Sequence, residues 1–436
     1  MASKKRNGFV AILLVGLMTA AAAMSACGGS GPGGSLPIAE ARSDNARILE
    51  PQVTDADLAE LVQGNSTFAF VLYRLLSDSD ENLFFSPYSI SAALAMTYAG
   101  ARTETEQEMA NALSFLLPQE RLHPGFNALD LALTEKIELR ENQTGDTFQL
   151  NIANTIWGEQ TYAFLPEFLD TLAENYGAGL QLVDFINNFE AARETINAWV
   201  SDQTEERIPE LLEKGTVKPS TRIALTNAIF FNACWLRPFD PAETRDGTFH
   251  LLDGSEVQTS MMHRGERSGY GEVDGVEIVP LRYEDFHYGM YAILPPEGEF
   301  ETFESSIDAE QIEALIDSVG DFRVDLTMPK FEFDSSFDLP ETLKELGMVS
   351  AFEPFVADLS GMDGTQDLFI SQIVHKAFVA VDEEGTEAAA ATGVLGEVTS
   401  SPGHAEVALN RPFLFLIRHE DTGTILFLGR VMDPTA

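Results

Sequence analysis

The side chains that carry out hydrolytic chemistry are present in this chain, but they do not stand at catalytic spacings. There is no Gly-x-Ser-x-Gly nucleophile elbow, no His-Glu-x-x-His zinc helix, no paired-cysteine metal pattern and no Gly-rich phosphate loop. We therefore expect no resident metal, no cofactor and no enzymatic activity. An enzyme that uses His375 or His287 with a distant serine and aspartate stays open, because geometry and not spacing defines a triad. The seven histidines are scattered without ligand spacing: His123, His250, His263, His287, His375, His404 and His419.

A second notable segment, Gly385–Leu395, contains almost no large side chain. By itself, Ala388–Ala391 is also compatible with a helical turn or a linker. However, a strand-like run, Leu368–Asp382, leads directly into it, and turn-forming residues follow it at Ser400–Gly403. We therefore expect a segment that is fixed at both ends and unpacked between them.

Cys27 is the third candidate for chemistry. It follows a basic start and an apolar run, Gly8–Ala23, which is too short for a comfortable membrane span. The residues Met24-Ser25-Ala26-Cys27 resemble the lipobox of bacterial lipoproteins, although methionine replaces the usual leucine. This resemblance implies a signal peptide at 1–26, lipidation of Cys27, a flexible tether at 27–54 and one domain at 55–436.

Two alternatives to lipidation stay open: an ordinary secretory signal cut near Ala23 or Ala26, and a retained membrane helix. All three place the protein outside the cytoplasm, in the cell envelope or the extracellular space. If Cys27 is lipidated, Cys234 has no partner for an intramolecular disulfide, and its apolar surroundings predict a buried residue.

Composition limits the classes of partner. The chain has 436 residues, of which 44% are hydrophobic, and it carries 69 acidic against 27 basic side chains, a formal charge of −42. Such a surface repels phosphate backbones, so we expect no nucleic acid partner. We interpret the acidic residues as a solvated surface that favours solubility. The alternative interpretation is that the acidic surface steers a basic protease toward the chain.

Hydrophobic periodicity predicts helices first and strands later, which is the α+β pattern. No linker or repeat interrupts the chain after Asp55, which favours one large domain. The predicted helices are Leu58–Leu76, one starting at Ser86-Pro87, Thr105–Leu117 and, within Glu194–Leu212, one that is helical until Pro209. The predicted strands are Phe148–Trp157, Arg222–Asn232, Phe322–Met328, Leu368–Asp382, Glu406–Ala408, Phe413–Arg418 and Thr424–Val431.

Six separated segments carry a family resemblance: Asn82–Ile90, Thr226–Phe239, Met328–Phe331, His375–Phe378 leading into Asp382–Thr392, Arg411–Ile417 and Leu426–Val431. Their residues and their order resemble the signatures of the serpins, a family of protease inhibitors. The resemblance implies a monomeric domain with three β-sheets, about nine helices and an exposed reactive-centre loop. Serpins trap a protease as a suicide substrate: the loop is cut, the acyl-enzyme forms, and the loop inserts into the main sheet.

The resemblance places the hinge of the loop in the small-residue segment. Alternation in the inserted strand would send Thr386, Ala388, Ala390 and Thr392 into the core, and all four are small. This pattern favours an inhibitory serpin, and a non-inhibitory serpin with a binding or structural role is the alternative. The hinge residues are Glu383, Gly385, Thr386, Glu387, Ala388, Ala389, Ala390, Ala391 and Thr392.

The resemblance also assigns the residues that hold and admit the loop. Ser86, Ser89, Asn227 and His375 would form a polar cluster where the sheet opens. Trp235 would lie where the loop enters, and Lys330 would pair with Glu383 to fasten the hinge. The native fold is expected to be metastable, so that kinetics preserve it.

The resemblance further implies a reactive bond at Thr399-Ser400, counted from the hinge. The bonds that follow Val398 and Ser401 are alternatives. No Lys or Arg lies between Val394 and Ala405, so we expect elastase-like or subtilisin-like serine proteases as targets, with cysteine proteases open. Residues 103–117, where some serpins bind heparin, lack a basic cluster, so no heparin binding is expected.

Overall fold

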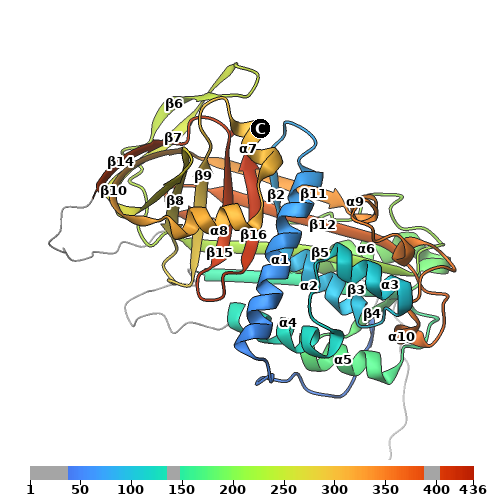
Figure 1. Ribbon diagram of the computed structural model, residues 1–436. Helices are drawn as coiled ribbons and strands as arrows, with labels where there is room; N and C mark the ends of the chain where they lie inside the picture. The colour runs from blue at the N-terminus through green and yellow to red at the C-terminus, as the bar shows by residue number, and fades with distance from the viewer. Residues whose placement is uncertain (1–37, 135–147, 387–402) are drawn as a thin grey trace, which may run out of the picture. The chain divides into compact units, whose positions relative to one another are not determined.

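The computed structural model describes residues 38–134, 148–386 and 403–436, and it has the α+β architecture predicted from the sequence (Figure 1). The helices of the described residues are α1 (Asp55–Leu76), α2 (Pro87–Tyr98), α3 (Thr103–Ala112), α4 (Gln119–Leu133), α5 (Pro166–Tyr176), α6 (Phe185–Gln203), α7 (Phe300–Ser306), α8 (Ala309–Asp317), α9 (Pro340–Glu345), α10 (Ser360–Asp363) and a 3-10 helix (Ser350–Phe352). The strands are β1 (Ala39–Ala41), β2 (Leu83–Phe85), β3 (Phe148–Glu159), β4 (Leu180–Val183), β5 (Ile223–Cys234), β6 (Arg245–His250), β7 (Glu256–Val273), β8 (Val276–Arg282), β9 (Tyr288–Leu294), β10 (Gly320–Pro329), β11 (Phe331–Asp338), β12 (Ile370–Val381), β13 (Gly385–Thr386), β14 (Gly403–Ala408), β15 (Phe413–His419) and β16 (Ile425–Val431).

The central sheet has seven strands in the order β1-β4-β3-β5-β13-β12-β11. Its strand β5 is buried on both faces. Ile229 and Phe231 pack into the large core on one side, whereas Ala224 and Ala228 belong to a smaller cluster with apolar residues of α6 on the other. A strand covered on both faces needs apolar side chains at nearly every position, which explains the continuous apolar run in this segment.

Most of the contact between β5 and β12 is a direct parallel pairing, which we call the β5–β12 seam. It joins residues 223–229 to residues 370–377. Beyond the seam, at the far end of β5, the two residues of β13 lie between the strands, with Gly385 opposite Cys234 and Thr386 opposite both Ala233 and Val381. The central sheet is therefore closed along the seam and holds a short extra strand at one end.

A second, nine-stranded sheet contains β2, β6–β10 and β14–β16. The long strand β7 divides it: residues 261–270 pair with β10, whereas residues 271–273 pair with β8. If this sheet is divided at β7, its two parts correspond to two of the three sheets expected from the sequence. The central sheet is the third.

Local signals in the sequence start the helices that frame the site. Thr54 caps α1, where its Oγ1 accepts a hydrogen bond from the backbone N–H of Asp57 at 3.1 Å. Ser86 caps α2 in the same way through the N–H of Ser89 at 3.1 Å, and Pro87 follows at the first helical position, where its missing N–H costs nothing.

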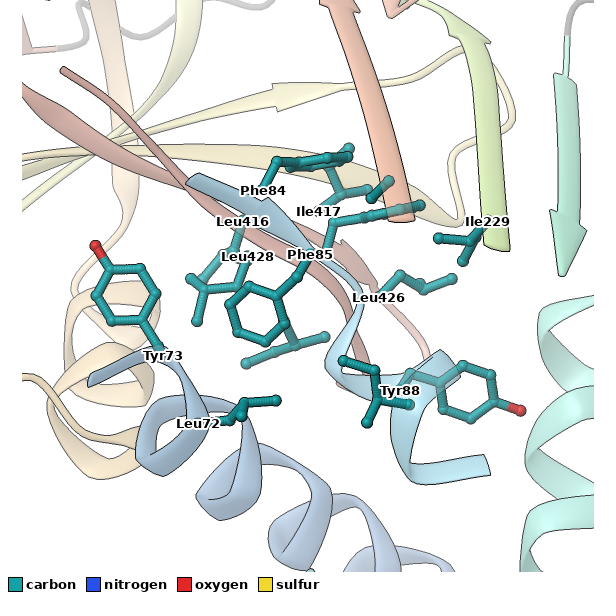
Figure 2. Packing of buried hydrophobic residues seen from close by; sticks show 14 of the residues in the cluster. Leu72, Tyr73, Phe84, Phe85, Tyr88, Ile229, Leu416, Ile417, Leu426 and Leu428 are labelled. Carbon is teal, nitrogen blue, oxygen red and sulfur yellow. The ribbon is translucent and has the colours of Figure 1, made fainter. Parts of the chain in front are cut away.

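The core beneath α2 is aromatic (Figure 2). The ring of Phe84 stacks on those of Phe427 and Phe415 at centroid distances of 4.8 and 5.6 Å. Phe85, on the same strand β2, is also fully buried, beside Leu72 of α1 in Figure 2. Because β2 runs directly into α2, this packing fixes the position of the α2 cap and of the polar residues in its first turn.

The segment before α1 differs from the tether predicted for residues 27–54. Residues 39–41 form β1, which pairs antiparallel with the edge strand β4. Arg47 donates to Asn127 Oδ1 at 2.8 Å and pairs with Asp130 at 2.7 Å, and the N–H of Ile48 donates to Glu174 O at 2.9 Å. From residue 38 onward the segment is thus docked on the domain, because it can complete a sheet edge and neutralise an acidic side chain.

Two predicted helix ends are corrected. The helix expected to reach Leu117 ends at Ala112, and Ser114 has a φ of 54° that breaks the helix. The helix expected from Glu194 until Pro209 is α6, which starts nine residues earlier and ends at Gln203, just before Glu205 and Glu206 with φ of 51° and 65°. Periodicity alone does not show where the backbone leaves the right-handed region.

Candidate functional site

Glu383 fastens the chain just before β13. Its carboxylate accepts a hydrogen bond from Lys330 Nζ at 2.6 Å and one from Thr244 Oγ1 at 2.7 Å. Burial raises the pKa of Glu383, but the hydrogen bonds from Lys330 and Thr244 outweigh that effect and lower it below the ordinary value. The predicted Lys330–Glu383 pair is therefore present in the structure, with the Lys330 side chain 39% exposed.

Trp235 holds the same turn from the side of β5. Its indole Nε1–H donates to Asp382 O at 3.0 Å, and its backbone N–H donates to Glu384 O at 2.9 Å. The turn closes on itself, because Asp382 Oδ1 accepts from the backbone N–H of Glu384 at 2.8 Å. Trp235 thus lies where the sequence placed it, at the point where the hinge joins the sheet.

Thr386, the last described residue of the hinge, is 1% exposed. Its Oγ1 lies 2.8 Å from the hydroxyl of Tyr283, whose ring stacks on Trp235 at a centroid distance of 4.6 Å. The inward phase predicted for Thr386 is therefore observed. Its small side chain fits the space between β5 and β12, and its hydroxyl has a partner there.

The predicted polar residues Ser86, Ser89, Asn227 and His375 lie together across the seam. Pairing sets Asn227 opposite His375, and the Oδ1 of Asn227 is hydrogen-bonded to His375 Nδ1. On the other side of the ring, His375 Nε2 accepts from the backbone N–H of Ser86 at 3.1 Å. Asn227 Nδ2 donates to Ser89 Oγ at 2.7 Å. We call these four residues, with Asn154, the sheet-opening cluster.

Burial decides the charge state of this cluster. His375 has no exposed surface, and desolvation lowers its pKa to about 3, so the ring is neutral at physiological pH. Because Nε2 accepts from an amide, the proton of the neutral ring is on Nδ1 and is donated to Asn227. The contacts of His375 are an amide N–H and a carboxamide, so its geometry is not that of a catalytic triad.

Three residues of this site were not predicted: Asn154, Tyr283 and Thr244. Asn154 lies opposite Asn227 on β3, accepts from Ser89 Oγ at 2.8 Å and is hydrogen-bonded to Asn227. The only signal in the sequence was an amide within the predicted strand Phe148–Trp157. The segments that carry Tyr283 and Thr244 have no local pattern that indicates the hinge. The tertiary fold brings these two residues into contact with it.

The remaining predicted site residues lie outside the described residues. They are Cys27, Glu387, Ala388, Ala389, Ala390, Ala391, Thr392, Val398, Thr399, Ser400 and Ser401.

Comparison with known proteins identifies the family. A family model described as "Serpin (serine protease inhibitor)" matches residues 63–434. The chain belongs to the serpin family. It is 38% identical over 376 residues to a leukocyte elastase inhibitor of Xenopus laevis, a match that covers 84% of this chain and 97% of that protein. It is also 38% identical over 378 residues to an uncharacterized serpin-like protein of Thermococcus kodakarensis, covering 86% of each.

A solved structure supports the same assignment. The crystal structure of tengpin, a thermophilic serpin in the native state, superimposes with a TM-score of 0.78 at 28% identity, covering 91% of this serpin and 100% of that chain. The predicted serpin fold is therefore confirmed. The relatives do not support the predicted bacterial type.

The functional class also needs restating. The lack of a catalytic motif led only to a negative expectation, that the chain is not an enzyme. The relatives correct this to a positive description, since the protein from Xenopus laevis is named as an inhibitor of an elastase. The similarity therefore supports protease inhibition as the functional class of this chain.

Proposed function

We propose that this serpin inhibits serine proteases as a suicide substrate, by cleavage of its loop and insertion of the hinge into the central sheet. The observation that carries the proposal is β13. Gly385 and Thr386 already pair with β5 on one side and β12 on the other, so the first step of a new strand is in place. The similarity to leukocyte elastase inhibitors supports the same activity.

The register of β13 gives the proposed path of insertion. Thr386 lies opposite Ala233 of β5, and each further residue would step one position back along β5. Ala388 would then meet Phe231, and Ala390 would meet Ile229, on the face that packs into the large core. Only small side chains fit there without displacing a close-packed interior, which matches the residues present.

Six positions beyond Thr386, the same register would bring Thr392 between Asn227 on β5 and His375 on β12. Insertion at that level must part the hydrogen bond that joins these two side chains. A hydroxyl can both donate and accept, so Thr392 can satisfy the groups that lose each other. This exchange explains why a polar cluster is suited to the middle of an otherwise apolar seam.

In the proposed reaction, the serine oxygen of the protease attacks the carbonyl carbon of Thr399. The peptide bond to Ser400 breaks, the new amine of Ser400 leaves with the proton, and an ester joins the two proteins. Insertion then removes the ester from its catalytic surroundings before water hydrolyses it. Lacking Lys and Arg, the loop suits elastase-like or subtilisin-like targets, and the serpin is proposed to act as a monomer without heparin.

The experiment is to mix the purified protein with pancreatic elastase or subtilisin and analyse the products on denaturing gels. We expect a band at the summed mass that survives SDS. Mass spectrometry of the released C-terminal peptide then identifies the reactive bond. The matched control is the protease with its catalytic serine replaced by alanine, which must give no such band.

Two outcomes would contradict the proposal. Stable inhibition that is fully reversible on denaturation would indicate a non-covalent mechanism. Cleavage of the loop without a complex, and without any rise in thermal stability of the cleaved serpin, would mean that the hinge does not insert. That second result would favour a non-inhibitory binding or structural role.

We further propose that Cys27 is lipidated and anchors the serpin outside the cytoplasm. The motif at Cys27 supports this proposal. In the part of the chain that the structure describes, no helix combines the length and the apolar character needed to cross a bilayer. Cys234 is buried at 3% exposure, and burial raises the pKa of its thiol to about 11, so it is a poor alternative site for a lipid.

The test is labelling of expressing cells with an alkyne fatty acid. We expect label and membrane association in the wild type and in Cys234→Ser, and loss of both in Cys27→Ser. Secretion of unlabelled protein would instead indicate an ordinary signal peptide.

A further inference from the structure

Two turns that are distant in sequence meet in the second sheet, at the same end of the paired strands β9 and β15. The turn between β8 and β9 carries His287, strand β15 ends at His419, and the turn that follows carries Asp421. The three residues each offer a ligand atom, and these atoms all lie within 4.8 Å of one another. None of the three belongs to the hinge contacts or to the sheet-opening cluster described above, and the proposed inhibitory mechanism does not use them.

Strand pairing holds the two turns together. Strands β9 and β15 are antiparallel neighbours, with Tyr288 opposite His419, so His287 is adjacent in space to the end of β15. The backbone N–H of Glu420 donates to His287 O at 2.7 Å. The two imidazole rings stack at a centroid distance of 6.1 Å and an interplanar angle of 15°. The juxtaposition therefore belongs to the sheet and does not depend on a flexible contact.

The orientation of each imidazole is set by a neighbour. His419 Nδ1 is hydrogen-bonded to Thr422 Oγ1 at 2.9 Å, which leaves the other ring nitrogen as the ligand. His287 Nδ1 already contacts a carboxylate oxygen of Asp421.

A second carboxylate lies behind the site. Asp285 Oδ1 accepts from the backbone N–H groups of His287 at 3.0 Å and Tyr288 at 3.1 Å. Its other oxygen, Oδ2, is buried, and no hydrogen-bond partner for it occurs among the described residues. An uncompensated buried acceptor at this turn adds negative potential next to the imidazoles, which favours a cation.

We propose that His287, His419 and Asp421 bind one Zn²⁺ ion, with water at the fourth position. Two imidazoles and one carboxylate are a ligand set that suits zinc, and a tetrahedral ion places them about 2.0–2.2 Å from the metal. The contact between His287 and Asp421 opens to admit the ion. The side chains of His287 and Asp421 are 41% and 65% exposed, so both the ion and its water can enter from solvent.

Bound zinc ties the β8–β9 turn to the β15–β16 turn. Tyr283, which contacts the hinge threonine, precedes His287 in the first of these turns. An ion that binds the folded protein and not the unfolded chain raises its apparent stability. We therefore expect zinc to raise the temperature of thermal unfolding by several degrees.

The experiment uses the untagged, chelator-treated full chain. Calorimetric titration with Zn²⁺ is expected to show one saturable site. With Co²⁺ in its place, the visible absorption spectrum of a tetrahedral ion is expected. His287→Gln and Asp421→Asn change exposed side chains, so both variants should fold and both should lose the site and the thermal shift. His419→Gln tests the buried ligand, with circular dichroism to verify its fold.

The matched control is His404→Gln. His404 also pairs with a carboxylate, Asp325, at 2.9 Å, but among the described residues it belongs to no group of three candidate ligands. This variant must keep both zinc binding and the thermal shift. The proposal is overturned if the wild type shows no saturable binding, or if binding survives in both His287→Gln and Asp421→Asn.

Discussion

Two places along the region where β5 meets β12, the hinge at one end and the sheet-opening cluster within the seam, are held by different forces. At the hinge, a charged pair between Lys330 and Glu383 fastens the turn, and the lysine is 39% exposed. At the sheet-opening cluster, neutral hydrogen bonds join Asn227 and His375 in full burial. Water and salt weaken an exposed pair, whereas a buried network loses stability when any member lacks a partner.

This difference indicates how a packed sheet can admit a strand. The hinge end can be released at small cost, because its charges can return to water. The buried cluster cannot return to water, so its groups must exchange partners as the strand arrives. In the proposed mechanism, the hinge would set where insertion begins, and the cluster would set whether it can continue.

The largest expected effect is that of a charge on the inserting face. Thr386→Arg places a guanidinium where the side chain must enter the core, at a cost of several kcal/mol. A cost of about 3 kcal/mol slows insertion roughly 100-fold, so most protease molecules escape by hydrolysis. The stoichiometry of inhibition of elastase, measured by titration, should rise accordingly.

The neighbouring position provides the control. Glu387→Arg has the opposite phase in the strand, so its charge would stay in water and inhibition should remain near that of the wild type. If the two variants behave alike, the alternation argument is wrong.

Loss of one amide from the cluster should have the next largest effect. Asn227→Ala leaves the partners on His375 and Ser89 unsatisfied in a buried site, at about 1–3 kcal/mol for each such group. We expect a lower midpoint of urea unfolding and faster formation of loop–sheet polymers. Asn232→Ala, on the same strand but only partly buried, should change the midpoint much less. Equal effects would mean that the cluster has no special role.

A titration with acid distinguishes the hinge from the sheet-opening cluster, because their titrating groups act in different pH windows. His375 is neutral when folded, with a pKa of about 3 against an ordinary 6.5. The unfolded state takes up a proton first, so this contribution to stability is complete above pH 6.5 and is lost as the pH falls toward 3. In urea unfolding, His375→Gln should reduce the slope of stability against pH in that window, by up to about 1.4 kcal/mol per pH unit.

Glu383 behaves as the contrasting case. Its pKa is lowered from an ordinary 4.5, so its contribution is complete above pH 4.5 and is lost below it. Glu383→Gln should leave the slope between pH 5 and 6.5 unchanged. A change there would show that the hinge and the cluster are not separate.

The smallest effect should come from the hinge lysine. Lys330→Met removes a half-exposed ion pair, which contributes at most about 1 kcal/mol, or roughly fivefold in the rate of inhibition. The difference from wild type should shrink at high salt. Lys376→Met is the control, since its pair with Asp334 on β11 lies away from the hinge. If Lys330→Met changed the rate of inhibition strongly and independently of salt, the ion pair between Lys330 and Glu383 would not be weak.

Several parts of the site could be predicted from the sequence. Ser86-Pro87 specifies a cap and a helix start by local chemistry, and both were predicted. The apolar run that became β5 required burial on both faces. The segment at 38–54 could not be predicted in the same way. Its polar composition suggested a tether, and the edge of β4 and the acidic side chain on α4 that hold it lie far away in the sequence.

The small-residue segment and the strand that leads into it could be predicted from consecutive residues alone. In the proposed mechanism, a strand that enters a packed sheet needs small side chains at alternate positions, which is a local property of the chain. The tertiary fold was needed to show which distant side chains meet. His287 and Asp421 are 134 positions apart, and the pairing of β9 with β15 joins them. Local patterns record backbone preference and burial, whereas a contact between distant turns depends on the register of the whole sheet.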